Sequence, residues 1–168
     1  MKLPSRKNIR LTDYDYSQNG AYFITICVKK KHELLGKIVG DGVLDVPPTT
    51  LSDTGIIVRD QLQLMSDFYN DISIEKHVVM PNHVHMIILL GNGWYRGTSG
   101  TPSPTNAVIP RFISTFKRFT HKQAGFSFWQ RGYHDHIIRN ETEYQKVWQY
   151  IDENPIKWTK DKYYCDND

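Results

Sequence analysis

Short stretches rich in aromatic and β-branched residues alternate along this chain with longer segments in which apolar residues recur every three or four positions. The first pattern is typical of β-strands and the second of amphipathic helices. The strand-like stretches are 21–28, 36–46, 72–80, 83–90 and 128–139, and the helix-like segments are 51–69, 107–123 and 141–152. In chain order, these patterns predict two strands, a helix, two strands, a helix, a strand and a last helix.

The stretch 36–46 contains Gly40 and Gly42 and is followed by Pro47, so we expect a second strand or one arm of a hairpin there. Without it, the order is βαββαβ with one further helix, which is the pattern of the ferredoxin-like split βαβ fold. We therefore predict an α+β protein: a ferredoxin-like antiparallel sheet with an additional C-terminal helix.

The length of 168 residues suits a single domain. We expect a basic N-terminal arm over 1–19, a flexible loop over 91–106, which is rich in Gly, Ser, Thr and Pro, and a C-terminal tail over 156–168. The helix of 107–123 could be broken near Pro110. Asn140 is suited to cap the last helix.

The composition indicates a folded protein that can contact nucleic acid. Hydrophobic residues make up 39% and charged residues 23%, which excludes a disordered or fibrous chain. The longest apolar run, 84–90, is too short to span a bilayer, and we see no secretory signal. The two cysteines lack metal-ligand or redox spacing, so a reduced cytoplasmic protein is expected. The net charge of +3 is compatible with phosphate contacts.

His83 and His85 are the sharpest local feature, because side chains two residues apart on a strand point to the same face. Two imidazoles placed in this way can reach one metal ion, while Val84 packs on the other face. Alone, this pattern is more often structural than functional. The chain has other histidines without an evident role, among them His77, His121, His134 and His136.

Tyr150 is the second feature, since it lies outside the apolar stripe of its helix. The stripe has the spacing i, i+3, i+4, i+7 and consists of Tyr144, Val147, Trp148 and Ile151. Tyr150 lies roughly 120° from the centre of this stripe, and Asn154 follows it one turn later with an amide oxygen that a cation could bind. A boundary tyrosine with a packed ring and a hydrated hydroxyl remains the alternative.

Taken together and in this order, these motifs resemble the HUH single-tyrosine transposases, and more narrowly the REP-associated tyrosine transposases. The resemblance covers nearly the whole chain, and its matching stretches are 14–16, 20–25, 79–85, 128–130, 135–140 and 150–155. It implies that His83 and His85 are metal ligands, that Tyr150 is the nucleophile and that Asn154 is a third, polar ligand. The loop 91–106 is longer than the family minimum, so contacts there cannot be transferred.

The implied activity is cleavage and strand transfer of single-stranded DNA through a 5′-phosphotyrosine intermediate. Mg²⁺ or Mn²⁺ suits the implied ligands. The resemblance also implies a hairpin substrate, as in repetitive extragenic palindromes, a monomer or homodimer, and a bacterial cytoplasmic location, on the nucleoid when bound to DNA. No membrane partner is expected.

Basic and aromatic residues outside these motifs are candidates for DNA binding by phosphate contacts or base stacking. They are Arg6, Lys7, Arg10, Trp94, Tyr95, Arg96, Lys117, Arg118 and Lys122. Solvated surface charge and an unrelated loop are the alternatives for these groups.

Two other functions are compatible with parts of the pattern. A domesticated transposase can lose catalysis and persist as a nucleic-acid-binding module on the same fold. A histidine-based nucleotide hydrolase or transferase would need a third histidine close by, where this chain has Met86 and Ile87.

Overall fold

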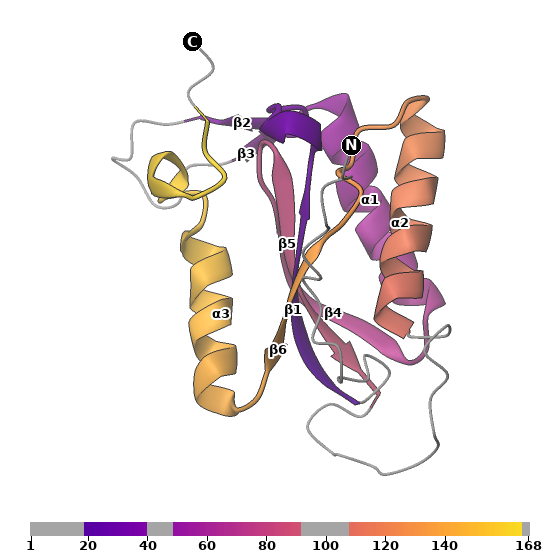
Figure 1. Ribbon diagram of the computed structural model, residues 1–168, viewed down its shortest axis with the longest axis vertical. Helices are drawn as coiled ribbons and strands as arrows, with labels where there is room; N and C mark the ends of the chain where they lie inside the picture. The colour runs from indigo at the N-terminus through magenta and orange to yellow at the C-terminus, as the bar shows by residue number, and fades with distance from the viewer. Residues whose placement is uncertain (1–18, 40–48, 92–107, 166–168) are drawn as a thin grey trace, which may run out of the picture.

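A four-stranded antiparallel sheet forms the centre of the protein, seen in a computed structural model that describes residues 19–39, 49–91 and 108–165 (Figure 1). Its spatial order is β4 (Ile72–Val79), β5 (His83–Leu90), β1 (Gly20–Cys27) and β6 (His134–Ile138). With helices after β1 and β5, this order is that of the ferredoxin-like fold. The predicted α+β fold class is therefore confirmed.

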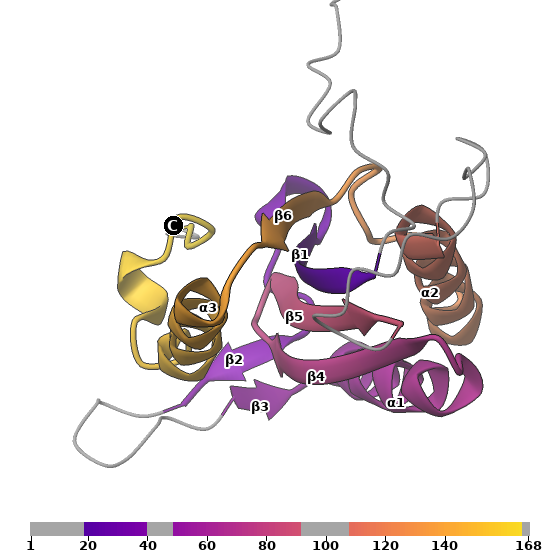
Figure 2. The ribbon, with the colours of Figure 1, turned by 90° about the horizontal axis from the view of Figure 1, so that it is seen from below.

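Helices cover both faces of this sheet. Helices α1 (Asp53–Phe68) and α2 (Val108–Ala124) pack on one face, and α3 (Glu141–Glu153) packs on the other (Figure 2). Central strands with covers on both faces are apolar on both faces, as β5 is from Met86 to Leu90. Among the described residues, no helix combines the length and apolarity that crossing a membrane requires.

Side-chain alternation along β1 and β5 divides the interior into two parts. Tyr22, Ile24 and Ile26 of β1, with Met86 and Ile88 of β5, belong to the main core under α1 and α2. Residues of the opposite parity face α3, where a smaller cluster joins Ala21, Ile87, Ile138 and Ile151. The apolar stripe predicted for the last helix packs against this smaller cluster, so the prediction of its buried face is confirmed.

Local signals in the sequence explain where the helices begin. Ser52 Oγ accepts a hydrogen bond from Gly55 N at 3.1 Å and caps α1. Asn140 caps α3 in the same way, as predicted, with its Oδ1 2.9 Å from Glu143 N. Pro110 does not break α2, because it lies in the first turn, where a backbone N–H has no acceptor within the helix.

Two expected strands are seen only in part. Within the stretch 36–46, β2 (Gly36–Ile38) pairs with β3 (Thr49–Leu51) in a separate ribbon, and positions 40–46 lie outside the described residues. Of the stretch 128–139, only β6 is a strand of the main sheet. Phe128 and Trp129 pack into the core, and the Trp129 indole donates a hydrogen bond to Thr120 Oγ1. Trp129 also forms an isolated antiparallel bridge with Val28, just beyond β1, so the aromatic pattern there reflects burial together with a short local pairing. Two short 3₁₀ segments complete the described elements, Lys29–Lys31 and Trp158–Lys160.

Candidate functional site

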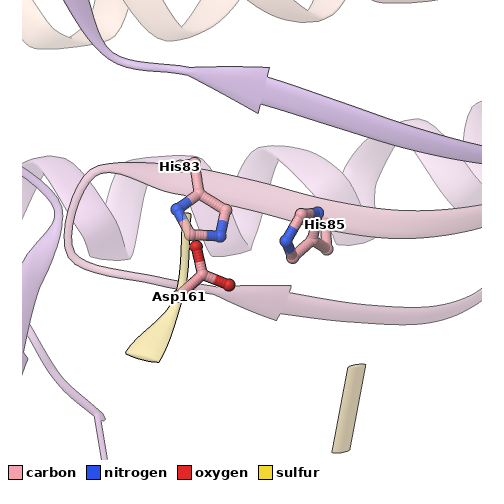
Figure 3. Close-up of side chains that lie close together, drawn as sticks. All are labelled: His83, His85 and Asp161. Atoms are coloured by element: carbon pink, nitrogen blue, oxygen red, sulfur yellow. The ribbon is translucent and has the colours of Figure 1, made fainter. Parts of the chain in front are cut away.

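His83 and His85 lie side by side at the start of β5, on the face covered by α3 (Figure 3). Both are fully buried, and their ring centroids are 4.4 Å apart. On the neighbouring strand β1, Cys27 pairs with His83 and Thr25 pairs with His85. The predicted common orientation of the two imidazoles is therefore present in the fold.

Each imidazole is held through its Nδ1 atom. His83 Nδ1 lies 2.8 Å from Asn82 Oδ1, and His85 Nδ1 lies 2.8 Å from Thr25 Oγ1. A proton on Nδ1 satisfies both contacts and leaves a lone pair on each Nε2. Metal-binding histidines are commonly fixed by this kind of outer hydrogen bond.

Asn82 is itself anchored on the side away from His83. Its Nδ2 donates to the backbone oxygens of Lys31, at 3.0 Å, and Tyr163, at 2.8 Å. The side chain is fully buried, so each of these bonds is shielded from water. The sequence marked Asn82 only as a turn residue, whereas the structure shows that it fixes the orientation of His83.

Asp161 brings a carboxylate to the two histidines from beyond α3 (Figure 3). Ligand atoms of His83, His85 and Asp161 all lie within 4.8 Å of one another. Asp161 Oδ1 accepts a hydrogen bond from Tyr163 N at 2.7 Å, which fixes the carboxylate. No sequence signal pointed to Asp161, because it is one acidic residue in a lysine-rich segment that was expected to be a tail.

Asn154 completes the cluster from the end of α3. Its Nδ2 donates to Asp161 Oδ2 at 3.0 Å. Its Oδ1 and the Nε2 atom of His83 are both buried and have no hydrogen-bond partner in the part of the chain that the structure describes. Leaving such atoms unpaired costs about 1–3 kcal/mol each, and a cation would satisfy both. Imidazole nitrogens with carboxylate and amide oxygens form a donor set that suits a divalent metal ion.

Burial keeps both imidazoles neutral. It lowers the pKa of His83 to about 4, although the Asp161 charge and the Asn154 side chain oppose this shift. Burial also lowers the pKa of His85 well below its ordinary value, and His83 adds to the effect. Neutral imidazole is the form that binds metals, so the ligands need not lose a proton near pH 7.

Tyr150 lies at the mouth of the cluster. Its ring meets Phe23 edge-on at 5.9 Å, and its hydroxyl lies 3.4 Å from His85 Nε2 and 3.1 Å from Asp161 Oδ2. The residue is 37% exposed, so a large substrate can reach the hydroxyl. Partial burial, followed by the charge of Asp161, raises the pKa of Tyr150 to about 12. This hydroxyl needs help to ionise at neutral pH.

The described part of the expected tail, 156–165, packs on the site. The Tyr163 ring lies 4.6 Å from the ring of His83 and 5.8 Å from that of His85, and Tyr163 is 7% exposed. Trp158 lies 5.9 Å from His83. These rings cover the histidines and exclude water from them.

Three lysines gather beside Tyr150. They are Lys157, Lys160 and Lys162, and together with Tyr150, Glu153, Asn154 and Asp161 they line a hollow of about 270 Å³. Ammonium groups around a hydroxyl attract phosphates. These lysines are not among the residues predicted from the sequence to bind DNA, although they lie close together within 157–162.

Of the residues predicted to bind DNA, those that the structure describes lie away from Tyr150. Lys117, Arg118 and Lys122 are on α2, which covers the opposite face of the sheet from Tyr150 (Figure 2). Lys117 Nζ donates to the backbone oxygens of Gln130, at 2.8 Å, and Gly132, at 2.6 Å, so it holds the chain before β6. The remaining candidates lie outside the described residues; they are Arg6, Lys7, Arg10, Trp94, Tyr95 and Arg96.

Comparisons with known proteins agree with the motifs. No family model matches the chain. A protein of Haemophilus influenzae with no characterised function is 33% identical over 96% of this chain and 94% of its own length, and the chain belongs to the same family. A REP-associated tyrosine transposase of Escherichia coli is 32% identical over 52% of this chain and 47% of its own length.

The fold has a matching solved structure. This structure is of a REP-associated tyrosine transposase bound to a REP hairpin. The two folds match with a TM-score of 0.59 and 20% identity, over 94% of this chain and 74% of that one. The resemblance to REP-associated tyrosine transposases is therefore confirmed, in sequence over about half of the chain and in fold over nearly all of it.

Proposed function

We propose that this protein is a metal-dependent transposase-type nuclease that cleaves and rejoins single-stranded DNA through Tyr150. The observation that carries the proposal is the position of the Tyr150 hydroxyl, 3.1 Å from Asp161 and 3.4 Å from His85. This hydroxyl lies at the mouth of a cluster in which two buried polar atoms lack partners among the described residues. A hydroxyl nucleophile beside residues that can hold a divalent cation is an arrangement suited to phosphodiester cleavage.

His83, His85 and Asp161 would hold the divalent cation, and the amide oxygen of Asn154 would contribute a fourth ligand atom. Asn154 is the third ligand implied by the resemblance, and Asp161 is added by the geometry. When bound, Mg²⁺ or Mn²⁺ neutralises charge on the scissile phosphate and orients it. Asn82 and Thr25 keep the two imidazoles in the orientation that ligation needs.

The covalent step is an exchange of one phosphodiester bond for another. Tyr150 Oη attacks phosphorus, the bond from phosphorus to the 3′ oxygen breaks, and the 5′ phosphate remains on the tyrosine. Asp161 Oδ2 is the acceptor nearest to the tyrosine proton. The departing 3′ oxygen takes a proton and becomes a hydroxyl. Attack by a 3′ hydroxyl on the phosphotyrosine reverses the step and joins strands.

The proposed substrate is single-stranded DNA that carries a hairpin. The proposed location of the activity is the bacterial cytoplasm. Lys157, Lys160 and Lys162 would contact phosphates close to Tyr150. The hairpin rests on the solved relative, which is bound to a REP hairpin. Contacts by the basic arm, the loop residues Trp94 to Arg96 and the cations of α2 remain part of the proposal.

Covalent capture tests this function. The full chain is incubated with Mn²⁺ and a library of end-labelled hairpin oligonucleotides that carry single-stranded flanks, and adducts are resolved on denaturing gels. The wild type and Tyr144→Phe should form an adduct, whereas Tyr150→Phe should form none and still bind DNA. Tyr144 is the matched control because it lies on the same helix but packs toward the sheet. Binding without any adduct in the wild type would support the inactive binding module instead.

A further inference from the structure

A second groove lies on the β6 side of the site. Its volume is about 360 Å³, and the residues that line it include Phe23, His134, His136, Lys162 and Tyr163. It lies between the edge of the main sheet and the C-terminal segment. Neither His134 nor the groove itself takes part in the proposed cleavage step.

The groove opens directly beside the reactive groups. Phe23 lines it, and its ring lies 5.1 Å from the ring of His85 and 5.9 Å from that of Tyr150. Thr25, which also lines it, holds His85 through the 2.8 Å contact to Nδ1. A molecule in the groove would therefore adjoin whatever group Tyr150 attacks.

The lining combines flat rings with one cation, Lys162, and one carboxylate, Asp135. The rings of His134 and Tyr163 are 6.4 Å apart, with 45° between their planes, and the Phe23 ring adds an apolar surface. Lys162 Nζ lies 4.9 Å from the centre of the Tyr163 ring. The same lysine lines the hollow on the Tyr150 side, together with Lys157 and Lys160. Lys162 thus connects an aromatic groove to a phosphate-attracting surface.

This combination fits a nucleotide better than other ligands. An inorganic anion would use the lysine but gain nothing from the rings, and a purely apolar ligand would leave the ammonium unused. An unpaired base can stack on aromatic side chains while its phosphate meets a cation. A base within a duplex is already stacked and paired, so it could not enter.

We propose that this groove binds the unpaired base of the nucleotide next to the scissile phosphate, with the base against Phe23, His134 and Tyr163 and with its phosphate near Lys162. The identity of that phosphate as the scissile one rests on the proposed function. Binding of the base itself needs neither metal nor the nucleophile. The groove would thereby select single-stranded DNA at the point of cleavage.

The test is a binding titration in EDTA, in which the NMR signals of the Phe23 and His134 rings report binding. The probes are the four deoxynucleoside 5′-monophosphates, with 2-deoxyribose 5-phosphate as the matched compound that lacks a base. At least one nucleotide should bind tenfold or more tightly than the sugar phosphate, since base stacking on aromatics contributes about 1–3 kcal/mol. Equal binding of all five probes, or ring signals that do not move, would overturn the proposal.

Variants locate the binding. His134→Ala and Lys162→Gln should each weaken nucleotide binding at least threefold, and Lys146→Gln, an exposed lysine of α3, should not. Wild-type affinity in both groove variants would count against the groove. Nucleotide binding without covalent adducts would refute the proposed cleavage alone, and adducts without nucleotide binding would refute the groove alone.

Discussion

The carboxylate of Asp161 accepts a hydrogen bond from the hydroxyl of Tyr150 at 3.1 Å, from a position eleven residues further along the chain. Both residues come from the C-terminal unit formed by α3 and the segment that follows it, whereas the two histidines come from the sheet. The same Asp161 oxygen accepts from Asn154. The carboxylate of Asp161 therefore connects the proposed nucleophile to the candidate metal ligands, which makes Asp161 the most informative residue to change.

Asp161→Asn should lower the pKa of Tyr150 and weaken Mn²⁺ binding. Burial is the main reason that this pKa is about 12, and the Asp161 charge is the second, so removing the charge moves the pKa toward 10. Loss of one anionic ligand should reduce Mn²⁺ affinity at least tenfold, an effect of about 1.4 kcal/mol. Tyrosinate absorbance, after subtraction of the same titration of Tyr150→Phe, measures the pKa of Tyr150. Calorimetry measures the Mn²⁺ affinity. Asp152→Asn is the control, and an unaltered Mn²⁺ affinity in Asp161→Asn would exclude Asp161 as a ligand.

Mn²⁺ should raise the melting temperature of the wild type by several degrees, because it satisfies buried atoms that lack partners. A ligand at a hundred times its Kd stabilises by about 2.7 kcal/mol. His83→Ala should lose this shift and reduce cleavage by orders of magnitude, while His32→Ala, at an exposed histidine, should behave as wild type. EDTA should abolish both the shift and cleavage. Full cleavage in EDTA would refute the metal-dependent model.

Asn82→Ala should destabilise the fold and also weaken metal binding. It removes two hydrogen bonds to backbone oxygens and the contact that orients His83. We expect a loss of about 2–4 kcal/mol in the free energy of unfolding and of about 10–100-fold in Mn²⁺ affinity. Asn140→Ala, which removes the α3 cap, should cost about 1 kcal/mol and leave the affinity unchanged. Equal Mn²⁺ affinities in the two variants would show that Asn82 does not position His83.

The metal-free protein should lose stability as the pH falls from about 6.5 to 4. The unfolded chain binds a proton on residue 83 near pH 6.5, whereas the folded protein resists protonation of His83 until about pH 4. The unfolded state therefore binds more protons in this window, and the free energy of unfolding falls by about 3 kcal/mol from this group. Urea unfolding in EDTA at several pH values gives the free energy of unfolding, which should fall less steeply with pH for His83→Gln than for the wild type. An equal pH dependence in the two proteins would contradict the neutral, buried state of His83.

Periodicity was sufficient to predict the sheet and helices, because strand and helix patterns coincide here with burial on defined faces. For 128–139 the predicted strand is confirmed over β6, whereas Phe128 and Trp129 lie before it and pack into the core, with a single bridge from Trp129 to Val28. Likewise His83, His85, Tyr150 and Asn154 could be selected from spacing within single elements. Asp161 could not, because its proximity to the histidines depends on how the chain turns after α3. Thr25 and Asn82 were missed for a related reason, since their roles come from cross-strand pairing and from a buried turn.

The main core and the candidate site lie on opposite faces of the sheet. The main core lies under α1 and α2, and Tyr150 is partly exposed on the opposite side, so removing its hydroxyl leaves the packing intact. A single substitution would therefore remove the proposed nucleophile at almost no cost in stability. A descendant with phenylalanine at this position would keep its fold and the lysines beside residue 150. Under the proposed function, an enzyme that cleaves DNA and a module that only binds it would differ on this fold by one oxygen atom.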